Sequence, residues 1–111
     1  MACRFRFCVG ACVSYFVLWA QDRPNSLELR RKLRPEHRAR LRQHDHPVVC
    51  HSGGPWLNDA GEMAGSILVI EAASIDAVQA YIAEDPYVQN DLYQSIEIRP
   101  FVWGLGQPED S

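Results

Sequence analysis

Apolar residues occur in short blocks along this chain, and the spacing within each block predicts its secondary structure. Continuous β-branched and aromatic runs predict strands over Tyr15–Ala20, Val48–Ser52 and Gly65–Ala72. A fourth strand is predicted over Ser95–Trp103, where apolar and charged residues alternate. Pro100 within this last strand cannot donate a backbone hydrogen bond, so it favours an edge position or a bulge.

Between the first two strands the pattern changes to a helical one. Asn25 with Glu28 three residues later resembles a capping box, and predicts a helix over Leu27–Leu33. A proline follows Arg34, and proline removes a hydrogen bond inside a helix but is favoured at the first position of one. We therefore expect a break at Arg34 and a second helix over Pro35–Gln43.

The second half of the chain contains a loop and two further helical segments. Gly53–Ala64 is rich in glycine and proline and predicts a loop. Ser74 is an N-cap for a helix over Ile75–Ile82, whose apolar residues follow helical spacing. Asp85, followed by proline, ends this helix and starts a short helical turn that extends to Leu92.

The predicted order is β-α-β-β-α-β, which with right-handed crossovers gives a ferredoxin-like α+β sheet with its helices on one face. In the strand at Gly65–Ala72, the run Ile67–Ile70 is apolar on both sides of the pleat, so both faces need cover. The helices cover only one face. A second copy packed sheet to sheet would cover the other, which predicts a homodimer.

Composition and charge restrict the class of protein. The chain has 111 residues, of which 47% are hydrophobic, and this suits one folded domain. We expect an N-terminal extension at residues 1–14, a folded domain at 15–104 and a polar tail at 105–111. The net charge of −3 gives no reason to expect a nucleic-acid partner.

The N-terminal extension has arginines, no acidic residue and an apolar run that continues into the first strand. The run is shorter than the roughly 20 residues that a membrane span needs, so no membrane association is expected. The cysteines, Cys3, Cys8, Cys12 and Cys50, form no CxxC pair and fit reduced thiols. We expect a cytoplasmic protein, with mitochondria as the alternative if residues 1–14 act as a presequence.

One histidine lies where a leucine would be expected. His37 is four residues after Leu33 and four before Leu41, so on a helix the three share a face that points inward. A histidine inside a small domain needs a partner, and Asp85 at a helix boundary is the best acidic candidate. From spacing alone, His37 also suits a hydrogen-bonded core residue, and Asp85 an N-cap.

Several short motifs together resemble the YciI-like family in order and spacing. They are AQDRPNSLELRRKLRPEHRARL, GGP, GS followed by LVIEA, DPYV, and LY followed by IRPF, and they extend over Tyr15–Trp103. The resemblance implies a dimeric α+β barrel, similar in fold to muconolactone isomerases. One branch of the family resembles dehydrochlorinases that act on chlorinated hydroquinones. The family's proposed active-site pair falls on His37 and Asp85.

This resemblance favours a His–Asp pair that transfers a proton in an isomerisation or elimination on a small anionic substrate. Arg34, one turn before His37, is the candidate for binding that anion. Ser66 and Tyr87 are candidates for hydroxyl contacts, and Gly54 for backbone approach to a ligand. The arginine-rich stretch around Arg34 is also explained by a solvated helix face.

The family usually has a glycine shortly after DPYV, where this chain has Asp91. Aspartate tolerates a left-handed backbone less well than glycine and adds charge. This departure favours the competing function, a non-catalytic ligand-binding or accessory protein on the same dimeric fold.

No cofactor is expected, since the chain has no phosphate-binding glycine loop or nucleotide fingerprint. Metal-ligand residue types gather in one stretch, at His44, Asp45, His46, Cys50 and His51. Their spacing matches no standard zinc site, so no metal is expected.

Overall fold

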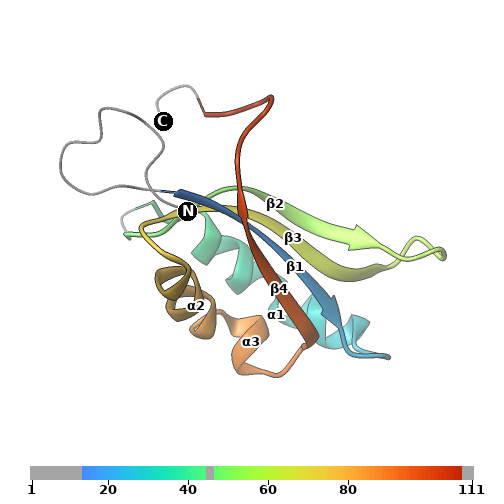
Figure 1. Ribbon diagram of the computed structural model, residues 1–111. Coiled ribbons are helices and arrows are strands. Elements are labelled where there is room, and N and C mark those ends of the chain that lie inside the picture. The colour runs from blue at the N-terminus through green and yellow to red at the C-terminus, as the bar shows by residue number, and fades with distance from the viewer. Residues whose placement is uncertain (1–13, 45–46, 109–111) are drawn as a thin grey trace, which may run out of the picture.

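The computed structural model describes residues 14–44 and 47–108 (Figure 1). The expectations for the N-terminal extension, for Asp45 and for His46 concern residues outside these ranges. The elements are β1 (Ser14–Asp22), α1 (Leu27–Leu41), β2 (Val49–Leu57), β3 (Met63–Ala72), α2 (Ile75–Ala83), α3 (Pro86–Gln89) and β4 (Tyr93–Phe101). Within the described ranges, no helix has the length and apolar character needed to cross a membrane.

The strands form one antiparallel sheet in the order β2-β3-β1-β4. All three helices lie on one face of this sheet (Figure 1). This is the predicted ferredoxin-like α+β fold, with α3 as an additional short helix. Among the residues that the structure describes, strand β4 pairs only with β1, so Pro100 lies on an edge strand, as expected.

The hydrophobic core fills the space between the sheet and the helices. On β1 and β3, alternate residues point into it, because side chains alternate between the faces of a strand. These core residues are Phe16, Leu18, Ala20, Leu68, Ile70 and Ala72. From the helices, Val78, Ile82 and Tyr87 close the core, and Leu33 and Leu41 of α1 pack against it.

Helix α1 is continuous, so the predicted break at Arg34 is wrong. Pro35 lies inside the helix on its exposed face. Proline has no backbone N–H, so the carbonyl of Arg31, four residues earlier and also exposed, loses its usual hydrogen bond. Water can reach that carbonyl, which reduces the cost of the proline. Packing of the inward-facing residues then holds both halves of α1 on one axis.

The predicted capping box is also wrong. The N-cap of α1 is Ser26, and its side chain makes no capping hydrogen bond. Asn25 lies in the turn before the helix with φ of 61°, a left-handed conformation that asparagine tolerates better than most residues. Asn25 therefore forms the turn and does not cap the helix.

The stretch predicted as a loop at Gly53–Ala64 is mostly strand. Strand β2 continues to Leu57 and pairs with β3 in a hairpin. Of the two glycines in this strand, Gly53 lies where packing is close: a Cβ there would lie 2.5 Å from the Leu68 side chain. Here glycine permits close approach within a sheet, which the sequence pattern did not distinguish from a turn.

The face of the sheet opposite the helices carries an apolar patch. It consists of Val17, Trp19, Trp56, Ile67 and Val69, which we call the outer-face patch. The Trp19 and Trp56 rings stack with centroids 4.8 Å apart. Trp19 remains 44% exposed and Ile67 37% exposed, so large apolar surfaces face outward in the single chain.

Candidate active site

The structure brings together His37 and Asp85, the two residues that the sequence analysis placed in one site. His37 comes from α1 and Asp85 from the junction of α2 and α3. The imidazole Nδ1 lies 2.9 Å from Oδ1 and 2.8 Å from Oδ2 of the carboxylate. The residues are only 6% and 4% exposed, so this is a buried pair.

Asp85 has a second role at the start of α3. Its Oδ1 accepts a hydrogen bond of 2.8 Å from the backbone N–H of Tyr87, which makes Asp85 the N-cap of this helix. The N-cap and the histidine partner were alternatives in the sequence analysis, and the structure shows both contacts. The cap fixes the carboxylate in a position that the His37 ring can reach.

The pair determines which histidine nitrogen is available for chemistry. Two carboxylate oxygens at Nδ1 require that this nitrogen carries a hydrogen and donates it. The other nitrogen, Nε2, makes no hydrogen bond to any other residue in the described ranges. In these ranges, the fully buried polar atoms without a hydrogen-bond partner do not include Nε2. Part of the surface of Nε2 is therefore accessible. In a neutral ring, Nε2 is the free base.

The ring of Tyr87 packs directly on this histidine. The two rings are nearly parallel, at 17°, with centroids 3.9 Å apart. Arg30 contacts the same tyrosine: its guanidinium carbon lies 4.6 Å from the ring centroid, and Nη1 donates to the hydroxyl at 3.4 Å. Burial raises the pKa of Tyr87 despite the nearby charge of Arg30, so its hydroxyl keeps its proton at neutral pH.

Arg30 is the centre of a buried polar cluster that the sequence analysis missed. Its guanidinium makes a bidentate pair with Asp22, at 2.7 and 3.0 Å, and donates to the Ser66 hydroxyl at 2.8 Å. Tyr93 donates to the same hydroxyl at 2.7 Å. Burial alone would lower the pKa of Arg30, but the hydrogen bonds and charge of Asp22 outweigh it, and the pKa is raised.

The solvated interpretation of the arginine-rich stretch is therefore wrong for Arg30, which is 1% exposed. The available signal was spacing: Arg30 lies seven residues before His37, which is two helical turns, and so shares its inward face. The same spacing that singled out the histidine applies to this arginine.

The remaining predicted binding residues lie in different surroundings. Arg34 is half-buried, and its charge acts on the Tyr87 hydroxyl. Ser66 is buried and bonded within the Arg30 cluster. Gly54 lies opposite Ile67 on β2, with open space where a Cβ would be, so it faces away from the helices and the His37–Asp85 pair.

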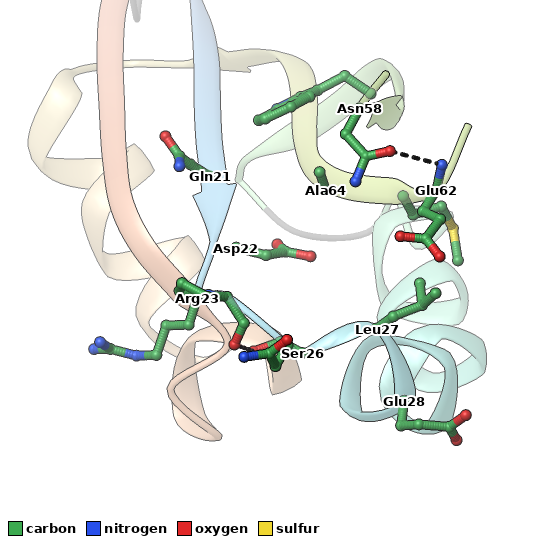
Figure 2. Close-up of a pocket in the computed structure, with 13 residues that line it drawn as sticks. Gln21, Asp22, Arg23, Ser26, Leu27, Glu28, Asn58, Glu62 and Ala64 are labelled. Atoms are coloured by element: carbon green, nitrogen blue, oxygen red, sulfur yellow. Dashed lines mark hydrogen bonds between the residues drawn. The ribbon is translucent and has the colours of Figure 1, made fainter. Parts of the chain in front are cut away.

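A cavity of about 610 Å³ opens at the other end of the polar cluster (Figure 2). It lies between the end of β1, the start of α1 and the hairpin that joins β2 and β3, with Asp22 in its wall. Neither His37 nor Asp85 lines it. The cavity therefore meets the buried cluster through the Asp22–Arg30 pair.

The residues considered as metal ligands do not converge where the structure describes them. Nε2 of His51 lies 2.6 Å from Oε1 of Glu71, and Cys50 is buried with its pKa raised by desolvation to about 11. Across residues 14–44 and 47–108, no three His, Cys, Asp or Glu residues are grouped so as to hold a metal ion.

Asp91 occupies the conformation expected of the family's glycine. Its φ is 59°, which is left-handed. Arg23 donates to its carboxylate at 2.9 Å and to its backbone carbonyl at 3.0 Å. The aspartate thus holds the turn before β4 with an ion pair to the end of β1.

Fold and site together define a small ferredoxin-like α+β protein with a buried histidine–aspartate pair, of the dimeric α+β barrel class. The chain belongs to the family defined by the YCII-related domain, whose model matches residues 14–102. Protein YciI of Escherichia coli O6:H1 is 38% identical over 93 residues, which cover 78% of this chain and 94% of that protein. An uncharacterized protein of Haemophilus influenzae is 31% identical, with 78% and 95% covered.

A solved structure is also similar in sequence and fold. It is 5-chloro-2-hydroxyhydroquinone dehydrochlorinase (TftG) from Burkholderia phenoliruptrix AC1100, in complex with 2,5-dihydroxybenzoquinone. The identity is 29% and the TM-score 0.71, and the match covers 81% of this chain and 95% of the other. The fold therefore occurs in an enzyme that acts on a small molecule.

Proposed function

We propose that this protein is a small-molecule enzyme that uses His37 and Asp85 for proton transfer, in an isomerisation or an elimination of the dehydrochlorinase type. The observation that carries the proposal is the buried contact of both Asp85 oxygens with Nδ1 of His37, which leaves Nε2 as a base. The similarity to a dehydrochlorinase supports an elimination from a hydroxylated ring.

In this mechanism Nε2 takes a proton from a substrate hydroxyl, or from a carbon beside a carbonyl. In an elimination from a hydroxylated ring, loss of a hydroxyl proton and gain of a proton at the chlorine-bearing carbon first give the keto tautomer, in which that carbon is tetrahedral. Loss of a second hydroxyl proton then moves an electron pair into the ring, the carbon–chlorine bond breaks and chloride leaves with its electrons. The Asp85 carboxylate stabilises the imidazolium that forms. In an isomerisation, the same nitrogen returns the proton to a different atom.

Charged and hydroxyl groups around the pair suit an anionic ring. Arg34 lies one turn before His37 and makes no hydrogen bond within the described ranges, so its guanidinium is available to a phenolate or carboxylate. Tyr87 is fully buried, so it acts on the site through the His37 ring that stacks on it and does not touch the substrate. Ser66 acts indirectly, because its hydroxyl holds Arg30 in place. The mechanism assigns no role to Gly54.

We also propose that the enzyme is a homodimer that buries the outer-face patch. A sheet with helices on one face leaves the other to be covered, and stacked tryptophans beside Ile67 make that face apolar. Charge placed at the centre of the patch, as in Ile67→Lys, should give a folded monomer by light scattering. A parent chain that is itself monomeric at micromolar concentration would refute the dimer.

The test of the activity is a panel of chlorinated and unchlorinated hydroxyhydroquinones, small phenols and lactones. Turnover is followed by absorbance and chloride release, and binding by thermal shift with 2,5-dihydroxybenzoquinone as a probe. We expect His37→Gln and Asp85→Asn to lose at least about 100-fold in turnover, since general acid–base catalysis contributes 10²–10⁴. The matched control is His44→Gln, at an exposed histidine shortly after the end of α1.

The competing function is non-catalytic binding of a small ligand on the same fold. The cavity beside Asp22, which His37 does not line, favours it. Binding of a panel compound that is unaffected by His37→Gln, without turnover of any compound, would support that function and contradict ours.

A further inference from the structure

Arg40 links the C-terminal end of α2 to the active-site aspartate. It lies three residues after His37 on α1, and its Nη2 donates to the backbone carbonyl of Tyr81 at 2.6 Å. The guanidinium carbon lies 4.2 Å from the centroid of the Tyr81 ring. The other terminal nitrogen, Nη1, lies 3.7 Å from Oδ2 of Asp85.

This position resolves an electrostatic problem in the site. Asp85 follows Glu84, the C-cap of α2, and so lies at the end of a helix where the aligned peptide dipoles are negative, and its carboxylate is buried. A negative charge is costly there, because the carbonyl dipoles of the last helical turn point toward it. Arg40 touches one of those carbonyls and faces the carboxylate, so a single cation compensates both.

One atom of Arg40 is left without a hydrogen bond. Nη1 is fully buried and has no partner in the part of the chain that the structure describes. Oδ2 of Asp85, the nearest carboxylate oxygen, already lies 2.8 Å from Nδ1 of His37. A movement of less than about 1 Å would place Nη1 at hydrogen-bond distance from Oδ2, so Arg40 lies where it can compete with His37 for this oxygen.

The other titratable groups around Asp85 are neutral at neutral pH. They are Tyr81 from α2, Tyr87 from α3, Cys50 from β2 and Tyr93 from β4, and burial raises the pKa of each. Arg30 and Arg34 direct their charges at Tyr87. Arg40 is thus the permanent cation in direct ion-pair range of the carboxylate.

We propose that Arg40 is a positioning residue: it competes with His37 for the Asp85 carboxylate and so lowers the affinity of the His37 ring for a proton. The inference rests on the proposed role of His37 and Asp85 in proton transfer. With Arg40 present, two donors compete for the carboxylate, and a nearby cation disfavours the imidazolium. Without it, Asp85 pairs with His37 alone, and the imidazolium becomes more stable.

The test is an NMR titration of the His37 ring in three single variants of the full chain. Removing the cation in Arg40→Met should raise the titration midpoint of His37 by about one pH unit, as expected for a charge a few ångströms away. Arg40→Lys keeps the cation, so the His37 midpoint should stay close to that of the parent. The control, Arg38→Met, removes an exposed cation of the same helix and should move the midpoint by less than about 0.3 unit, because water screens it.

A purely structural role predicts a different result. If Arg40 only caps α2, Arg40→Met lowers the melting temperature and leaves the midpoint of His37 unchanged, which would overturn the inference. Should Arg40→Met fail to fold, Arg40→Gln retains a donor for the Tyr81 carbonyl without the charge, and the same midpoint decides. A shifted midpoint without turnover of any panel compound upholds the positioning role and counts against the enzyme.

Discussion

Replacing Arg30 by methionine should destabilise the protein more than most single substitutions. The change retains much of the side-chain volume but removes the guanidinium that pairs with Asp22 at 2.7 and 3.0 Å. The Asp22 side chain is 5% exposed, so its carboxylate would be left buried without a cation. The Ser66 hydroxyl would also lose one of its two donors.

The size of the effect follows from this burial. Breaking a buried ion pair by removing one partner costs about 3–5 kcal/mol, because the remaining charge is uncompensated. A domain of this size has a free energy of unfolding of about 5–15 kcal/mol. Arg30→Met should therefore remove about a fifth or more of the stability. Adding Asp22→Leu removes the second charge, and should bring the protein back to within about 2 kcal/mol of the parent.

Urea unfolding at pH 7, followed by tryptophan fluorescence, measures both changes. The control is Arg31→Met, one residue along, where the side chain is 60% exposed and the loss should stay below about 0.5 kcal/mol. The reasoning is refuted if Arg30→Met costs less than about 1 kcal/mol, or if the double variant is no more stable than the single one.

Three further changes test other parts of the structure. Ser66→Ala leaves the Tyr93 hydroxyl without its acceptor and leaves Nη2 of Arg30 with Asp22 alone, and should cost about 1–3 kcal/mol in the free energy of unfolding. Burial raises the pKa of Cys50 from 9.0 to about 11, so its contribution to stability is present below pH 9 and lost as the pH rises to 11. Between those pH values, the parent should lose about 2 kcal/mol relative to Cys50→Ala. Asp91→Gly should be more stable than Asp91→Ala by about 1 kcal/mol, because only glycine adopts a φ of 59° without strain.

Each of these has a matched control or a contrary outcome. Ser95→Ala, on the exposed part of β4, should be nearly neutral in the same urea experiment. A constant stability difference between parent and Cys50→Ala from pH 8 to 11 would mean that folding does not raise the pKa of the thiol. Equal stability of the two Asp91 variants would mean that the turn relaxes out of the left-handed conformation.

The fold could be predicted because its signals are local and repeated. Four strand patterns and the Ser74 cap were identified from residues close together in sequence, and the element order then selected the topology. The errors occurred where packing outweighed local preference. Pro35 is accommodated in α1 because it faces water, and Gly53 lies in a strand because Leu68 packs against it.

The site was only partly predictable for the same reason. His37 stood out because an isolated histidine interrupts a leucine stripe, whereas Arg30 and Arg40 were hidden among exposed arginines. Their partners lie far away in sequence: Tyr87 is 57 residues from Arg30, and Tyr81 is 41 from Arg40. Only the folded chain shows which cations of one helix face inward and which charges they meet.

The double contact of Asp85 affects how such a site can change during evolution. One oxygen both starts α3 and orients the histidine, so a chain that had given up catalysis would still keep an aspartate there for the sake of the helix. Asparagine would preserve the helix cap but remove the charge that faces His37, so this substitution separates the two roles of Asp85. Among diverging relatives, loss of the proposed activity should therefore first become visible at the position of His37, which no helix start protects.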